Sequence, residues 1–416
     1  MGFLKPQNLL LPLLLISFMA TGIPVMQPVF WLNARWPIIG LVAILVAVSR
    51  FPSTVTRPML VTFTLYAGWC VATTLWSEQP RLTISKSAAM VLVSLAGLRA
   101  GHLWQIRHET TRALDFLWPS AILSLFASFG GDAAVQSEGL GMLTGSTAGS
   151  NFLGFVVATS IPLVLWKIHT ETGNKRLVWA GLLLASFYIL YLTVSRGSYL
   201  VALGAISGAL LSRHLGRSTT AALFLGWTLL LLVLVAPAAA DRVFQRNVVK
   251  SPISGGVLDS RQDNWNESYA AAQNGGWFGV GYGVSTGVDV EGGLALMFTR
   301  AYGREKGNSQ FAIVEETGVI GLSLYVVLVV LLMRRLIIGT MAATGSQRIL
   351  LGIITGTLLG MIMQSIVEAW WDGPGSTEFC YFWVMAGAGL AIVKTMAKQQ
   401  TIRFRQSVVQ SKLRRA

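Results

Sequence analysis

The sequence predicts an all-α polytopic membrane protein with about twelve transmembrane helices and one large loop between the ninth and the tenth. Composition is the first indication: of the 416 residues, 53% are hydrophobic and only 12% are charged, whereas a soluble domain has about 25% charged residues. The second is that apolar runs of about 15–20 residues, near the length that crosses a bilayer, follow one another with short polar joints. The third is a single long polar stretch, residues 237–317.

The predicted spans are taken in order from these apolar runs, with polar or glycine-rich joints as their limits. Those before the loop cover Asn8–Met26, Trp36–Val48, Pro58–Trp76, Leu82–Leu98, Ala113–Phe129, Ser150–Trp166, Leu177–Val194, Ser198–Leu211 and Thr219–Val235. Those after the loop cover Gly318–Met333, Ile349–Val367 and Glu378–Val393. The second and the eighth are short for a full crossing, which predicts extension at their ends or a partly re-entrant path.

The chain therefore divides into residues 1–236 with the first set of helices, the loop 237–317, residues 318–394 with the last helices, and a basic tail 395–416. Lysine and arginine concentrate in alternate joints, which by the positive-inside rule makes those joints and both termini cytoplasmic. The loop then faces the outside or the periplasm. Its aromatic side chains, Trp265, Trp277, Tyr282 and Phe298, are too many for a typical disordered linker, so we expect a folded loop that carries the function.

The net charge of +14 does not indicate nucleic-acid binding, because the basic residues lie at the ends of apolar runs and in the tail. Cys70 and Cys380 fall within apolar runs without metal-ligand spacing, and we interpret them as buried apolar residues. All four histidines lie in predicted cytoplasmic joints, so the outer face has no histidine for a zinc site. No cofactor is predicted.

Polar residues at the predicted outer ends of spans are the candidate site residues, because charge near lipid is expensive unless it faces a cavity. Arg196 alone separates two apolar runs, and its guanidinium suits the oxygens of a phosphate or pyrophosphate. An interfacial arginine whose side chain reaches toward water is the equally weighted alternative.

In the loop, Arg261 precedes Trp265 by four residues, the spacing of one turn of an amphipathic surface helix. The glycines on both sides of Tyr282 allow backbone to approach a ligand. A packed surface helix with an exposed arginine explains the first pattern equally well.

The third group is the run Lys306-Gly307-Asn308-Ser309, followed by the adjacent carboxylates Glu315 and Glu316. We expect the two carboxylates on different helix faces and not as a matched acid–base pair. Partners of a helix N-terminal dipole are the alternative for these carboxylates. A looser outer set is Glu78, Arg81, Lys86, Asn151, Glu368 and Asp372.

Taken together, these motifs resemble those of the O-antigen ligase and lipid-linked polysaccharide polymerase superfamily. The resemblance covers most of the chain, from about Trp76 to Trp371. Its motifs are Trp76-Ser77 with Pro80, Asn151 after Gly141 and Gly145, Ser195-Arg196-Gly197, Ser260-Arg261 with Trp265, the glycine-rich run 279–283, and Asn308-Ser309 followed by Glu316, Gly318 and Gly321.

The resemblance implies a metal-independent, inverting glycosyltransferase that uses an undecaprenyl-pyrophosphate-linked glycan donor. The acceptor is another lipid-linked glycan in polymerases of exopolysaccharide or O-antigen, and a lipid A core of lipopolysaccharide in ligases. It further implies that Arg196 and Arg261 hold the donor pyrophosphate. A chain-length regulator is a further partner, and no nucleic acid is expected.

One position departs from the family pattern, because Gly307 stands where members often carry a histidine that assists the acceptor hydroxyl. A base must then come from elsewhere, with Glu316, Glu305 and Asp263 as candidates. Gly307 favours a polymerase over a ligase. The alternatives are a transporter or flippase of a lipid-linked glycan, which the absence of internal repeats or broken spans disfavours, and a non-catalytic partner in polysaccharide assembly.

Overall fold

The computed structural model describes residues 6–23, 55–129, 142–214, 259–286 and 306–413, together with residues 37 and 40. Within these ranges the chain is helical and has no strand. The helices are α1 (Pro6–Met19), α3 (Arg57–Ala72), α4 (Pro80–Arg107), α5 (Trp118–Phe129), α6 (Ser150–Thr170), α7 (Gly173–Thr193), α8 (Arg196–His214), α12 (Asp259–Gly275), α13 (Ser309–Ala342), α14 (Gly345–Val367) and α15 (Thr377–Leu413). Short 3₁₀ turns are Ala20–Gly22, Thr73–Leu75, Thr110–Arg112 and Asp115–Leu117.

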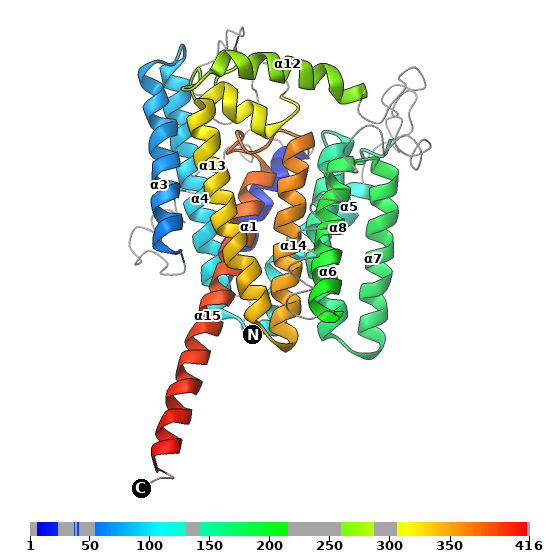
Figure 1. Cartoon of the computed structure of the whole chain (residues 1–416). Helices are drawn as coiled ribbons and strands as arrows, with labels where there is room; N and C mark the ends of the chain where they lie inside the picture. The colour runs from blue at the N-terminus through cyan, green and yellow to red at the C-terminus, as the bar shows by residue number, and fades with distance from the viewer. Residues whose placement is uncertain are drawn as a thin grey trace.

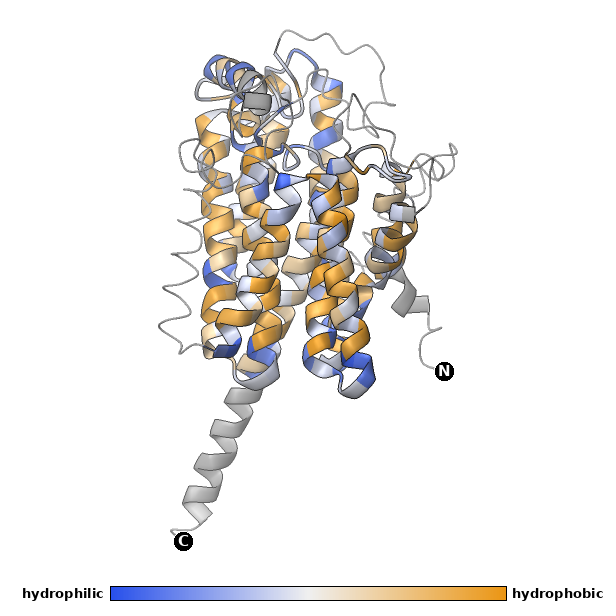
Figure 2. Ribbon diagram, turned by 90° about the vertical axis from the view of Figure 1, so that its right-hand side faces the viewer, coloured by the Kyte–Doolittle hydropathy of each residue, from blue (hydrophilic) through white to orange (hydrophobic). Residues whose placement is uncertain are grey.

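Seven helices in the described part of the chain are long and apolar enough to cross a membrane. They are Arg57–Leu75, Pro80–Arg107, Ser150–Thr170, Gly173–Thr193, Ser309–Ala342, Gly345–Val367 and Thr377–Lys398. Each coincides with a predicted span, which confirms an α-helical membrane protein with several spans. Figure 2 shows the corresponding apolar colour along the bundle.

The remaining predicted spans have different outcomes. The first corresponds to a shorter apolar helix, Leu11–Gly22, and the fifth to α5, which has 12 residues. The eighth corresponds to α8, which has 19 residues but is not among the seven apolar helices. The spans Trp36–Val48 and Thr219–Val235 fall on residues outside the described ranges, apart from 37 and 40. The total of about twelve therefore stays a prediction.

The helices form one bundle, and α12 lies across one of its ends (Figure 1). We call this the α12 end; the first residues of α4, α6, α8, α13 and α15 lie there. The α6, α14 and α15 spans are the most enclosed, whereas α3 and α7 lie at opposite edges and are largely exposed. Exposed apolar side chains on those two edge helices, such as Leu65 of α3 and Leu184 of α7, are positioned to face lipid.

In two pairs of helices, glycines allow the backbones of the two partners to come into contact. Along α8 and α14, added Cβ atoms at Gly204 and Gly208 would meet backbone atoms of Gly356 and Gly352. Along α4 and α15, one at Gly101 would meet backbone atoms of Val384 and Ala388. Small residues of this kind allow membrane helices to pack closely without help from the hydrophobic effect.

Helix α13 begins at Ser309, inside the predicted loop, and is interrupted at Gly318, whose φ and ψ are 70° and −174°. The predicted span began at Gly318, so the second part of the helix matches it. The interruption therefore lies at the first residue of the predicted span and not within it.

A turn after α12 supplies hydrogen bonds at this interruption. Val280 and Gly281 donate their N–H groups to the carbonyls of Glu315 and Glu316, at 2.9 and 3.0 Å. Below the break, Val319 donates to the carbonyl of Gly276 at 3.0 Å. Backbone groups freed at a break must be satisfied inside a membrane protein, and the 276–281 turn does this.

Candidate functional site

The α12 end brings polar residues from three helix starts close together. The first contact is between α6 and α8, where a Cβ atom at Gly154 would meet the side chains of Ser195 and Ser198. The two serine hydroxyls share a hydrogen bond of 2.7 Å. Asn151 lies one turn before Gly154, half-buried, so it begins α6 beside the start of α8.

Arg196 is the first residue of α8 and is half-buried. It follows a sharp turn at Val194, whose φ of 51° is left-handed, an outlier for a β-branched residue. A Cβ atom at the next residue, Gly197, would lie 3.2 Å from the carboxyl carbon of Glu368. The turn therefore sets Arg196 at the point where α8 meets the segment after α14.

The same segment, residues 368–372, holds the start of α13. The Ser309 hydroxyl donates to the Glu368 carbonyl at 3.3 Å and accepts from the backbone N–H of Trp370 and Trp371 at 3.0 and 3.2 Å. Asn308 caps the helix, because its side-chain oxygen accepts from the N–H groups of Gln310 and Phe311. Its amide nitrogen donates to the carbonyl of Ile366 at 2.9 Å.

Helix α12 also contacts the start of α13, at Gly307. The indole N–H of Trp265 donates to the Gly307 carbonyl at 3.1 Å, and Ser268 accepts from the Gly307 N–H at 3.3 Å. Gly307, where the resemblance expects a histidine, is thus held on both sides of its backbone by α12. Asn151, Arg196, Glu368, Asn308 and Trp265 thus lie at neighbouring helix ends, and we call these five residues the polar path.

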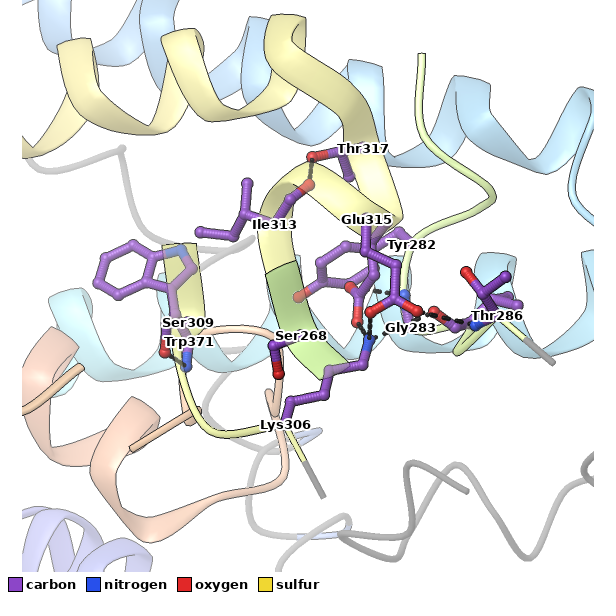
Figure 3. A network of polar contacts seen from close by, with 12 residues as sticks. Ser268, Tyr282, Gly283, Thr286, Lys306, Ser309, Ile313, Glu315, Thr317 and Trp371 are labelled. Carbon is purple, nitrogen blue, oxygen red and sulfur yellow. Dashed lines mark hydrogen bonds and ion pairs between the residues drawn. The ribbon is translucent and has the colours of Figure 1, made fainter. Parts of the chain in front are cut away.

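A second polar group lies next to this path, buried around Lys306 (Figure 3). The ammonium of Lys306 lies 2.5 Å from Oε1 of Glu316 and 3.5 Å from Oε2 of Glu315, with all three side chains fully enclosed. It also donates to the carbonyl of Val284 at 3.3 Å. We call Lys306, Glu315 and Glu316 the lysine–glutamate cluster.

One oxygen of each glutamate carboxylate accepts a hydrogen bond from the backbone of the segment after α12. Oε2 of Glu316 accepts from the Gly283 N–H, and Oε1 of Glu315 accepts from the Thr286 N–H, each at 2.8 Å. The expectation that the two glutamates point to different helix faces was wrong. They lie at the C-terminal end of the first part of α13, and Lys306 enters between them from the loop. Both carboxylates of the cluster therefore bind protein groups.

Lys86 and Asp372 are two further buried ionisable residues beside the lysine–glutamate cluster. Lys86 is 3% exposed, and the stem of its side chain packs at Gly283, where a Cβ atom would meet Lys86 Cδ. Asp372 is fully buried, and neither carboxylate oxygen has a hydrogen-bond partner. Both Lys86 and Lys306 attract its charge.

The pKa directions of the two groups outside the spans follow from burial and neighbouring charge. Burial raises the pKa of Asp372 above its ordinary value of 3.8, and the attraction of Lys306 and Lys86 offsets only part of that. For Lys306, burial acts to lower the pKa, but Glu316 and Glu315 outweigh it, so the pKa of Lys306 is raised. The two glutamates therefore favour the charged form of Lys306, and burial makes Asp372 easier to protonate than an ordinary aspartate.

Aromatic side chains attach the glycine-rich turn to α3. The indole N–H groups of Trp69 and Trp76 donate to the carbonyls of Thr317 and Gly279, at 2.8 and 3.0 Å. The Phe278 ring contacts both tryptophans. Tyr282 is fully buried, and its backbone N–H donates to Thr73 at 3.0 Å. Tyr282 is thus a packing residue of this turn in the structure.

The predicted site residues separate into three sets. Asn151, Arg196, Trp265 and Asn308 lie along the polar path described above. Glu316, Lys86 and Tyr282 lie in or beside the buried charged group. Arg81 is exposed at the start of α4, and Arg261 lies in α12 with a side chain outside the described part. The candidate bases Asp263 and Glu305 are outside it too. These binding and catalytic roles stay predictions.

Sequence reasoning missed the roles of Lys306 and Asp372. Lys306 stood next to the Asn308-Ser309 motif but was not assigned to the site, and Asp372 was placed in a looser interfacial set. The available signal was an ionisable residue at the end of an apolar run, which by default marks a functional site. No group of His, Cys, Asp or Glu that could hold a metal ion occurs among the described residues.

No family model matches the chain, and the search of curated proteins finds no match either.

Proposed function

We propose that this chain is a bacterial inner-membrane glycosyltransferase that transfers or polymerises undecaprenyl-pyrophosphate-linked glycan units at its α12 end. The observation that carries the proposal is the polar path, in which Asn151, Arg196 and Asn308 come from three different helix starts, and the starts of α8 and α13 both lie against residues 366–368. The motif resemblance described above supports the same assignment.

The chemistry requires a cation near the leaving group. In an inverting transfer, an acceptor hydroxyl attacks the anomeric carbon while the bond from that carbon to the pyrophosphate oxygen breaks. The bonding electrons leave with undecaprenyl pyrophosphate, and the hydroxyl proton passes to a base. A guanidinium stabilises the charge that develops on the pyrophosphate, and Arg196 is the arginine on the path.

Lys86 and Lys306 are less suited to that role. Both are almost fully buried, and Lys306 is already neutralised by two carboxylates. Glu316 is likewise occupied on both oxygens, by Lys306 and by Gly283. We therefore propose that the lysine–glutamate cluster positions the loop over the site, and we assign no described carboxylate as the base.

The test is reconstitution of the purified chain in liposomes with an undecaprenyl-pyrophosphate-linked glycan and a metal chelator. Extension of the glycan on its lipid carrier identifies a polymerase. Transfer only after addition of a lipid A core acceptor identifies a ligase. Absence of both products, with protein that retains its folded melting transition, contradicts the proposal.

A second candidate function has one observation in its favour. The interruption of α13 at Gly318, with buried carboxylates beside it, is typical of transporters, whose broken helices form substrate sites. In this chain, however, the 276–281 turn and Trp69 take up the backbone groups at the break. Movement of a labelled lipid-linked glycan across the liposome membrane, without any covalent product, would favour the transporter.

A further inference from the structure

Four basic side chains gather at the end of the bundle opposite α12, where α4 and α15 pack together. They are Arg99, His102 and Arg107 of α4 and Lys394 of α15, and we call them the basic site. The helices approach at backbone distance beside them, since a Cβ atom at Gly101 would meet Val384 and Ala388. Figure 1 shows α4 and α15 side by side.

Two members of the basic site are enclosed by protein. Arg99 is 9% exposed and His102 is 7% exposed, whereas Lys394 is half-buried and Arg107 is exposed at the last residue of α4. Their charges act on one another: Arg107 acts on Arg99, and both Arg99 and Lys394 act on His102. The four side chains thus lie in one neighbourhood at this end of the α4–α15 pair.

Arg99 has no counter-charge in the described part of the chain, and the His102 imidazole beside it supplies none. Nε of Arg99 and Nδ1 of His102 are buried without a hydrogen-bond partner. No described carboxylate forms an ion pair with either side chain. By contrast, the other enclosed cation of this end, Lys167 of α6, pairs with Asp115 at 2.7 Å.

This arrangement calls for an anion. Enclosing a cation without a partner is unfavourable, because its hydration is lost and nothing replaces it. A phosphate fits better than a carboxylate, since its oxygens can accept from the guanidinium of Arg99 and from two further cations, Arg107 and Lys394, at once. Basic pockets between membrane helices are known to take lipid phosphate groups.

We propose that Arg99, His102, Arg107 and Lys394 bind a phosphate-bearing anion, either an anionic phospholipid headgroup or free phosphate, between α4 and α15. The site lies at the opposite end of the bundle from the proposed glycosyl transfer and does not depend on it.

The experiment measures the melting temperature of the full chain in lipid nanodiscs of three kinds. The first contains only phosphatidylcholine, the second adds phosphatidylglycerol, and the third is phosphatidylcholine with inorganic phosphate in the buffer. A ligand that binds only the folded state raises the melting temperature, here by at least about 3 °C. Stabilisation by phosphatidylglycerol alone identifies a headgroup, and equal stabilisation by phosphate identifies the free anion.

Variants link this stabilisation to the site. Arg99→Gln and His102→Asn are expected to lose most of the shift, whereas Arg99→Lys keeps the charge and retains a substantial part of it. Arg334→Gln is the matched control, because Arg334 is an exposed arginine in the second half of α13. The proposal is overturned if neither anion stabilises the wild-type chain, or if Arg334→Gln reduces the shift as much as Arg99→Gln.

Discussion

At the scale of single residues, Lys306 determines whether the buried charge is balanced. It lies between Glu315 and Glu316 with all three side chains enclosed. Removing one partner of a buried ion pair destabilises a protein by more than the intact pair stabilises it, because the remaining charge is left buried without a counter-charge.

We therefore predict that Lys306→Met lowers the free energy of unfolding by about 3–5 kcal/mol, measured by denaturant titration in mixed micelles. The control is Lys175→Met, because Lys175 is exposed in the first turn of α7. Combining Lys306→Met with Glu316→Gln should restore part of the loss. Equal stability of Lys306→Met and Lys175→Met would show that the lysine–glutamate cluster makes no net contribution to the free energy of unfolding.

Asp372 gives a prediction on pH dependence. Because burial raises its pKa, the folded state prefers the neutral carboxyl. Its contribution to stability is complete below the ordinary pKa of 3.8 and is lost as the pH rises through the raised value. Asp372→Asn keeps a neutral polar group, so its melting temperature should fall less than that of the wild type on going from acid to mildly basic pH.

At mildly basic pH, Asp372→Asn is then expected to be at least as stable as the wild type. A clear loss of stability in the variant at that pH would mean that Asp372 is ionised and paired with Lys86 or Lys306. Thermal scans across a pH series distinguish the two cases.

At the scale of elements, the interruption of α13 connects the site to the membrane helices. Gly318 has a left-handed φ of 70°, and a Cβ atom there would overlap the backbone of Trp277. Gly345 has a similar φ of 56° but nothing within 4 Å of its Cβ position. Substitutions at the two positions therefore distinguish two costs. Backbone strain is expected at both Gly318 and Gly345, whereas steric overlap is expected only at Gly318.

We predict that Gly345→Ala costs about 1 kcal/mol through strain alone, whereas Gly318→Ala costs clearly more and loosens the glycine-rich turn from α13. Loosening is measured as faster hydrogen exchange of the Val280 and Gly281 N–H groups, which donate across the break. The same exchange rates in Gly318→Ala as in the wild type would contradict the role given to the turn.

At the scale of the whole molecule, the alternation of basic joints predicts which end faces outward. Cys70 and Cys380 are buried, so an introduced cysteine is labelled against a low background. Glu78→Cys, before α4 at the α12 end, should react with an impermeant thiol reagent added to intact cells, and Asn174→Cys, in the first turn of α7 at the opposite end, should react only after permeabilisation. The reverse result would invert the topology.

The sequence predicted the membrane helices well because an apolar run of bilayer length is a local signal. The site was only partly predictable. Arg196 and Asn308 were found because they lie at the ends of apolar runs. Lys306 and Asp372 come together with Glu316 across 56 residues of chain, from Glu316 to Asp372, a long-range arrangement that spacing along the chain does not encode. The break at Gly318 also depends on the distant turn that supports it.

The most direct measurement compares Arg196→Ala with Arg213→Ala in the liposome reconstitution with undecaprenyl-pyrophosphate-linked glycan. Arg196 begins α8 on the polar path, and Arg213 is exposed near the other end of the same helix. The account predicts that Arg213→Ala forms product at the wild-type rate while Arg196→Ala loses at least about 100-fold, with both variants melting like the wild type. Wild-type product formation by Arg196→Ala would contradict a glycosyl-transfer site at the start of α8.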